Sequence, residues 1–143
     1  EAIPDARIIW THRDPKDCLA SYGSLSAVQH RMMYGKYDPE RAGRVTLRDM
    51  DYSFRAGMAA RDQIPSGQLI DVKYRELTSD PVACLERICT ELDLPFDRAH
   101  TKTHLEGLKP KGPRHRPQLQ QWGLNEQMVR ERLDFYDPEW WTF

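Results

Sequence analysis

Two polar side chains, eight residues apart near the start of the chain, have the chemistry needed to hold a phosphate. Arg13 carries a guanidinium that stays charged and can bind two phosphate oxygens at once. Ser21 offers a hydroxyl, so the two residues could hold a phosphate from two sides. The simpler alternative is that Arg13 pairs with Asp14 or Asp17 at the surface while Ser21 faces solvent. The spacing alone leaves both interpretations open.

The segment 6–25 that carries these residues is predicted to be a strand followed by a helix. Residues 7–11 include three consecutive bulky residues that favour a strand covered on both faces. Asp14 is a typical helix cap, and Pro15 suits the first helical position. A helix start presents free N–H groups and the positive end of the dipole, so the turn at Arg13 is a candidate anion site. The apolar stripe predicted for this helix is Cys18, Leu19, Tyr22 and Leu25.

Two enzyme families share features of this segment. His12-Arg13-Asp14 is similar to a protein-kinase catalytic loop. However, Leu19 stands where that motif needs Asn, and no Asp-Phe-Gly follows, so the kinase interpretation fails. The longer motif Arg13-Asp-Pro-x-Asp17-x-x-x-Ser21-Tyr22 resembles the second nucleotide motif of sulfotransferases that use 3′-phosphoadenosine 5′-phosphosulfate (PAPS). The resemblance implies that Arg13 and Ser21 bind the 3′-phosphate of this donor. It also implies a P-loop-like, three-layer α/β/α fold.

The rest of the chain fits an α/β protein. Residues 46–62 have the apolar period of a helix, and residues 68–77 form a second predicted strand. With a helix after it, the element 68–93 completes the order expected of a parallel sheet. Residues 27–45 are less regular, and could be either a lid over a substrate or a loop packed on the core. A terminal helix is predicted over 125–136, with Asn125 as its cap.

Tyr74 lies in a stretch similar to the Tyr-Glu-x-Leu element of the same family. The resemblance implies that Tyr74 lies near the adenine of the donor, although Arg75 replaces the usual Glu. A tyrosine in a strand also packs commonly within a sheet, and this interpretation is equally open.

Residues 109–116 are the most basic stretch of the chain. Such stretches are often solvated surface or nucleic-acid patches. The resemblance implies instead a Gly-containing loop that closes over the nucleotide, with Lys111, Gly112 and Arg114 as candidate contacts.

Composition narrows the class of protein further. Of the 143 residues, 39% are hydrophobic and 30% are charged, which is typical of a globular protein, and the net charge of −1 gives no general attraction to nucleic acid. We see no membrane-spanning run and no signal peptide, and three cysteines on apolar helix faces favour reduced thiols in a cytoplasmic protein. His100 and His104 have a metal-ligand spacing but no third ligand nearby, so no metal is expected.

The resemblance implies transfer of a sulfuryl group from PAPS to a hydroxyl or amine of a small-molecule or carbohydrate acceptor. The strand and phosphate loop that would hold the 5′ end of the donor are not found in residues 1–143, nor is the family's acid–base residue. His12 is adjacent to the motif, but we do not assign it as the base. We therefore expect a partial domain that supplies the 3′-phosphate and adenine side of the site. The alternative is a non-catalytic module that binds nucleotides or polyanions.

Overall fold

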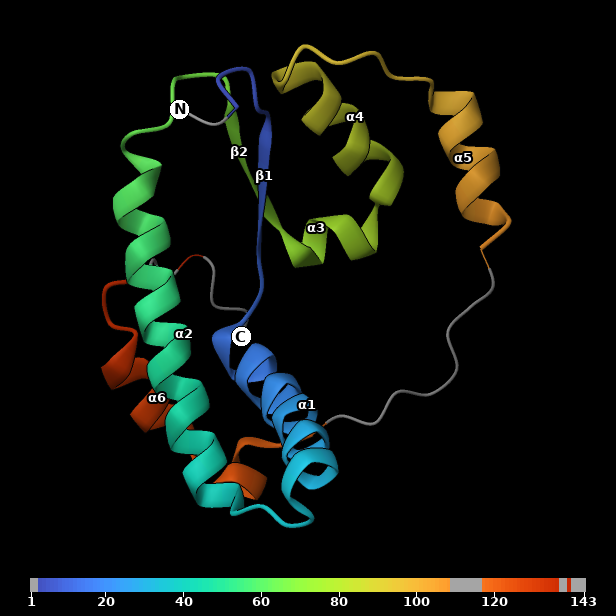
Figure 1. Cartoon of the computed structure of the whole chain (residues 1–143). Helices are drawn as coiled ribbons and strands as arrows, with labels where there is room; N and C mark the ends of the chain where they lie inside the picture. The colour runs from blue at the N-terminus through green and yellow to red at the C-terminus, as the bar shows by residue number, and fades with distance from the viewer. Residues whose placement is uncertain (1–2, 109–116, 137–138, 140–143) are drawn as a thin grey trace. The chain divides into compact units, whose positions relative to one another are not determined.

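The structure is a computed structural model that describes residues 3–108, 117–136 and 139. Its elements follow the order expected of an α/β protein, and the two strands are parallel (Figure 1). The chain divides into two compact units, one of residues 1–12 and 61–114 and the other of residues 13–60 and 115–143. None of the described helices is long and apolar enough to cross a membrane.

The first unit is built on a two-stranded parallel sheet. Strands β1 (Ile8–His12) and β2 (Leu69–Lys73) pair in a register that runs from Ile8 opposite Leu69 to His12 opposite Lys73. One sheet face buries Ile70 and Val72 against helix α4 (Pro81–Glu91), whose contributing residues are Cys84, Ile88 and, just after the helix, Leu92. Asp80 caps α4 by accepting a hydrogen bond from the Ala83 N–H at 3.1 Å. Helix α5 (Arg98–Glu106) follows.

The second strand is shorter than predicted. It ends at Lys73, and residues 74–79 form a short helix, α3 (Tyr74–Ser79), instead of the last part of a strand. Tyr74 is the last β-favouring residue of the segment, and the Arg-Glu-Leu that follows it consists of strong helix formers. The hydroxyl of Thr78 donates to the carbonyl of Tyr74 at 3.0 Å, one helical turn back. Tyr74 therefore starts a helix and is not a strand residue.

The prediction that β1 is covered on both faces is wrong for the described residues. The side chains of Ile8 and Ile9 are 38% and 48% exposed. Within the described part of the chain, β1 has β2 as its one hydrogen-bonded neighbour. A run of bulky residues favours a strand, but it does not by itself supply neighbouring elements that would cover both faces.

The second unit packs helices around Trp122. Helix α1 (Pro15–Tyr34) and helix α2 (Pro39–Arg61) contribute to a core with the 3₁₀ helix η1 (Leu119–Trp122) and helix α6 (Glu126–Arg132). The indole N–H of Trp122 donates to the carbonyl of Ala20 at 3.2 Å. A Cβ at Gly43 would lie 2.0 Å from the Trp122 carbonyl oxygen, so this close approach requires glycine. The Asn125 side chain caps α6 as predicted, accepting from the Met128 N–H at 2.9 Å, but α6 ends at Arg132.

Two predictions about α1 and its surroundings are wrong. Residues 27–45 are mostly helical, because α1 continues to Tyr34 and α2 begins at Pro39 rather than at residue 46. The buried stripe of α1 also differs, since Tyr22 and Leu25 are 46% and 52% exposed. Small side chains let η1 approach closely, whereas the sequence pattern was weighted toward large apolar residues. The residues buried along α1 are Pro15, Leu19, Ala20, Gly23 and Ala27.

Candidate functional site

The first turn of α1 already has its own carboxylate. Asp14 is buried, and its side chain accepts a hydrogen bond from the Lys16 N–H at 2.8 Å. Pro15 has no N–H to offer. The Nζ of Lys16 lies 3.6 Å from Asp14 and 3.1 Å from Glu126 on α6. Because these first groups are engaged, any phosphate at this end of α1 would have to be held mainly by side chains.

Arg13 and Ser21 lie along one side of α1. A guanidinium nitrogen of Arg13 is 3.1 Å from a carboxylate oxygen of Asp17, and these side chains are 40% and 60% exposed. Asp17 and Ser21 are four residues apart and therefore share a helix face. Ser21 is exposed on that face. The surface ion pair expected as the simpler alternative is thus present, and the Arg13 side chain reaches the face that carries Ser21.

Cys18 follows Asp17 on α1, and its thiol is partly buried. Its Sγ is 4.0 Å from the carbonyl oxygen of Arg13. Burial raises the pKa of the Cys18 thiol, against the opposing charge of Arg13. The thiol therefore stays protonated near neutral pH and is a poor nucleophile. All three cysteines are free.

A second polar group lies on the sheet of the first unit. The buried His12 places Nε2 2.7 Å from Oδ1 of Asp71, and the same oxygen accepts from Nη1 of Arg61 at 2.7 Å. The other guanidinium nitrogen of Arg61 contacts the second oxygen of Asp71. The ring of Trp10 stacks on His12 with centroids 5.3 Å apart. We call His12, Arg61 and Asp71 the sheet triad.

The contacts within the sheet triad lower the pKa of Asp71. The hydrogen bond from Arg61 lowers the pKa of the Asp71 carboxyl, although burial opposes the shift, and His12 lowers it further. Asp71 is therefore a carboxylate at neutral pH, bound by two neighbours. Sequence reasoning missed this triad. The available signal was an aspartate in the middle of an otherwise apolar strand.

The other predicted site residues are only partly placed. Tyr74 is the first residue of α3 and is half-buried in the first unit, whereas Arg13 and Ser21 belong to the second. Lys111, Gly112 and Arg114 lie outside the described residues. His100 and His104 are exposed on α5. Residues 3–108 and 117–136 contain no group of three or more His, Cys, Asp or Glu that could hold a metal ion.

These observations describe an α/β protein in which Arg13 lies just before the first helix, α1. Comparison with known proteins gives the family: the model of the sulfotransferase family matches residues 1–98, so the chain belongs to the sulfotransferase family. This confirms the family inferred from the motif at Arg13. A search of the curated proteins finds no significant match.

Solved structures show the same fold. Sulfotransferase STF9 from Mycobacterium avium is similar with a TM-score of 0.78 and 24% identity, over 93% of this chain. Sulfotransferase STF1 from Mycobacterium tuberculosis H37Rv is similar with a TM-score of 0.70 and 26% identity, over 90% of this chain. The match covers 36% of the STF9 chain and 33% of the STF1 chain, so residues 1–143 span about a third of these relatives. The predicted α/β class is confirmed.

Proposed function

We propose that this chain supplies the 3′-phosphate side of a PAPS site in a sulfotransferase. The reaction would be transfer of a sulfuryl group to a hydroxyl or amine of a small-molecule or carbohydrate acceptor. The observation that carries the proposal is the contact of Arg13 with Asp17, one helical turn before Ser21 on α1, in a chain of this family. Tyr74 is proposed to lie near the adenine, and Lys111, Gly112 and Arg114 to contact the nucleotide.

Phosphate binding at Arg13 would replace a weak contact with a stronger one. The Arg13–Asp17 pair is solvent-exposed, and exposed pairs four residues apart stabilise a helix by only about 0.3–0.5 kcal/mol. A phosphate offers two charged oxygens in the geometry that a guanidinium prefers. Ser21 can donate its hydroxyl proton to the same phosphate. The guanidinium also offsets the repulsion between the phosphate and Asp17.

The residues described here bind and orient the donor. When bound, PAPS would supply the sulfuryl group that the acceptor oxygen or nitrogen receives. Interactions with the 3′-phosphate accelerate this step only if the sulfate end is held in line with the acceptor. We therefore expect residues 1–143 alone to bind adenosine 3′,5′-bisphosphate weakly and to transfer no sulfate.

Calorimetric titration with adenosine 3′,5′-bisphosphate tests the proposed site. Arg13→Ala should cost about 1.5–3 kcal/mol of binding free energy, and Ser21→Ala about 0.5–1.5 kcal/mol. AMP lacks the 3′-phosphate, so its affinity should hardly change in either variant. Arg48→Ala is the matched control, because Arg48 is another exposed arginine that pairs with a neighbouring aspartate. Equal bisphosphate affinity in the wild-type protein and in Arg13→Ala would reject the assignment.

A further inference from the structure

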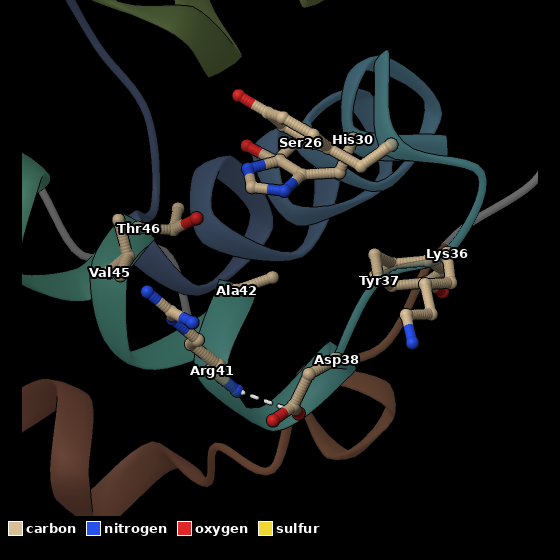
Figure 2. Close-up of a pocket in the computed structure, with 10 residues that line it drawn as sticks. Ser26, His30, Lys36, Tyr37, Asp38, Arg41, Ala42, Val45 and Thr46 are labelled. Atoms are coloured by element: carbon tan, nitrogen blue, oxygen red, sulfur yellow. Dashed lines mark hydrogen bonds between the residues drawn. The ribbon is translucent and has the colours of Figure 1, made fainter. Parts of the chain in front are cut away.

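A pocket of about 670 Å³ lies between the second half of α1 and the first turns of α2 (Figure 2). All of its lining residues belong to the second unit. The picture shows Ser26 and His30 on one wall and Arg41 with Asp38 on the facing wall. This volume is in the range of small-molecule sites. The lining residues with polar or aromatic side chains include Ser26, His30, Lys36, Tyr37, Arg41 and Thr46.

The two cations of the pocket have no carboxylate partner among the described residues. Neither Lys36 nor Arg41 forms an ion pair there, and both side chains are exposed. Several other arginines of this unit lie within 4.0 Å of a carboxylate, among them Arg13, Arg44, Arg48, Arg55 and Arg132. The pocket therefore brings together two cations, Lys36 and Arg41, that are available to bind an anion.

The one carboxylate in the lining is already engaged with the backbone. Asp38 accepts a hydrogen bond from the Arg41 N–H at 3.1 Å, at the beginning of α2. The Lys36 and Arg41 cations and the Asp38 carboxylate together carry one net positive charge. This charge matches a ligand that carries a single negative charge.

Rings and apolar side chains form the rest of the pocket. The rings of His30 and Tyr34 are 5.6 Å apart between centroids. Tyr37 is held by Trp122, at 6.4 Å between centroids, and by the guanidinium of Arg31, at 5.6 Å from its ring. Aromatic rings of this kind pack favourably against a flat ring in a ligand.

We propose that this pocket binds a small aromatic molecule with one carboxylate or sulfate group. Lys36 and Arg41 hold the charged group, and the ring lies against His30, Tyr34 and Tyr37. The buried Thr46 contributes a hydroxyl to the lining. The site shares no residue with the proposed donor site at Arg13 and Ser21, so the inference does not depend on that assignment.

The test compares two ligands that differ mainly in charge. The chain is titrated by calorimetry with 4-hydroxybenzoate and with its neutral counterpart 4-hydroxybenzamide. We expect 4-hydroxybenzoate to bind and the amide to bind at least about tenfold more weakly, because a charge-assisted contact is lost. Equal affinity of the two ligands, or binding of neither at millimolar concentration, would overturn the proposal.

Variants then locate the binding. Arg41→Gln and Lys36→Gln should each weaken 4-hydroxybenzoate binding by about fivefold to tenfold, and the double variant should weaken it further. Arg48→Gln, on the same helix but paired with Asp49 outside the pocket, should leave the affinity unchanged. Circular dichroism and thermal melting confirm that each variant is folded. Folded variants of Arg41 and Lys36 that bind as the wild type does would place the ligand elsewhere and contradict the proposal.

Discussion

Two arginine–aspartate pairs in this protein differ in how firmly they are held. In the sheet triad, Asp71 accepts from both Arg61 and His12, and its side chain is 27% exposed. At the start of α1, Arg13 contacts Asp17 at 3.1 Å, and the aspartate is 60% exposed. The first carboxylate is fixed by several partners in a partly buried place. The second is held by a contact that water screens.

This difference separates a structural pair from one that can exchange its partner. Removing one member of a buried pair leaves the other charge without compensation, so such a pair is costly to break. An exposed pair gains little, so its arginine is available to a better anion. The comparison therefore predicts that Asp71 contributes to stability, and it supports the proposal that Arg13 binds a ligand.

The largest effect should come from breaking the sheet triad. Asp71→Asn removes the charge that Arg61 and His12 share, and we expect it to lower the free energy of unfolding by about 1–3 kcal/mol. Urea or thermal unfolding of both proteins at pH 7 measures the difference. A loss below about 0.5 kcal/mol would show that the triad is no firmer than the surface pair at Arg13.

Lowering the pH should gradually remove the stabilisation that the Asp71 carboxylate provides. The Asp71 pKa is lowered in the folded protein, chiefly by its hydrogen bond with Arg61. Its stabilising contribution is therefore complete above the unfolded carboxyl pKa of about 3.9 and is lost as the pH falls through the lower folded value. Melting curves at several pH values should show the wild type and Asp71→Asn converging as the pH falls below about 4. A constant difference down to the lowest pH would contradict this account.

The basic segment 109–116 should contribute to nucleotide binding, but by a smaller free energy than Arg13. Lys111→Ala and Arg114→Ala are each expected to weaken bisphosphate binding by up to about 1.5 kcal/mol. Retention on heparin or RNA should stay poor in the wild type. Tight RNA or heparin binding with a steep salt dependence would favour the non-catalytic polyanion-binding module instead.

The smallest effect on stability should come from the surface pair. Asp17→Asn should change the free energy of unfolding by no more than about 0.5 kcal/mol. It should also strengthen bisphosphate binding by a few fold, because a like charge next to the phosphate is removed. Weaker bisphosphate binding in Asp17→Asn would mean that Asp17 positions Arg13 rather than competing with the phosphate.

The sequence predicted two helix starts correctly but missed the start of α2 at Pro39. Asp14-Pro15 and Asp80-Pro81 each start a helix as expected, because a cap and a following proline act locally. The extent of α1 was wrong, since it depends on packing partners distant in the sequence. The stripe of α1 shows this most clearly, because Gly23 is buried for the approach of Trp122.

Only part of the candidate site was predicted from the sequence. The motif at Arg13 and Ser21 gave the family correctly, because its residues are close in the chain. The sheet triad could not be found in this way, since His12 and Asp71 meet only through the parallel register of two strands. The roles of Arg13, Ser21 and Tyr74 remain proposals.

A crystal structure of the protein with adenosine 3′,5′-bisphosphate tests the central claim most directly. We expect the 3′-phosphate on the face of α1 that carries Ser21, with Arg13 turned from Asp17 and donating to phosphate oxygens at about 2.7–3.2 Å. The Ser21 hydroxyl should donate to the same phosphate. A bound nucleotide whose 3′-phosphate lies elsewhere, with Arg13 still on Asp17, would contradict the account.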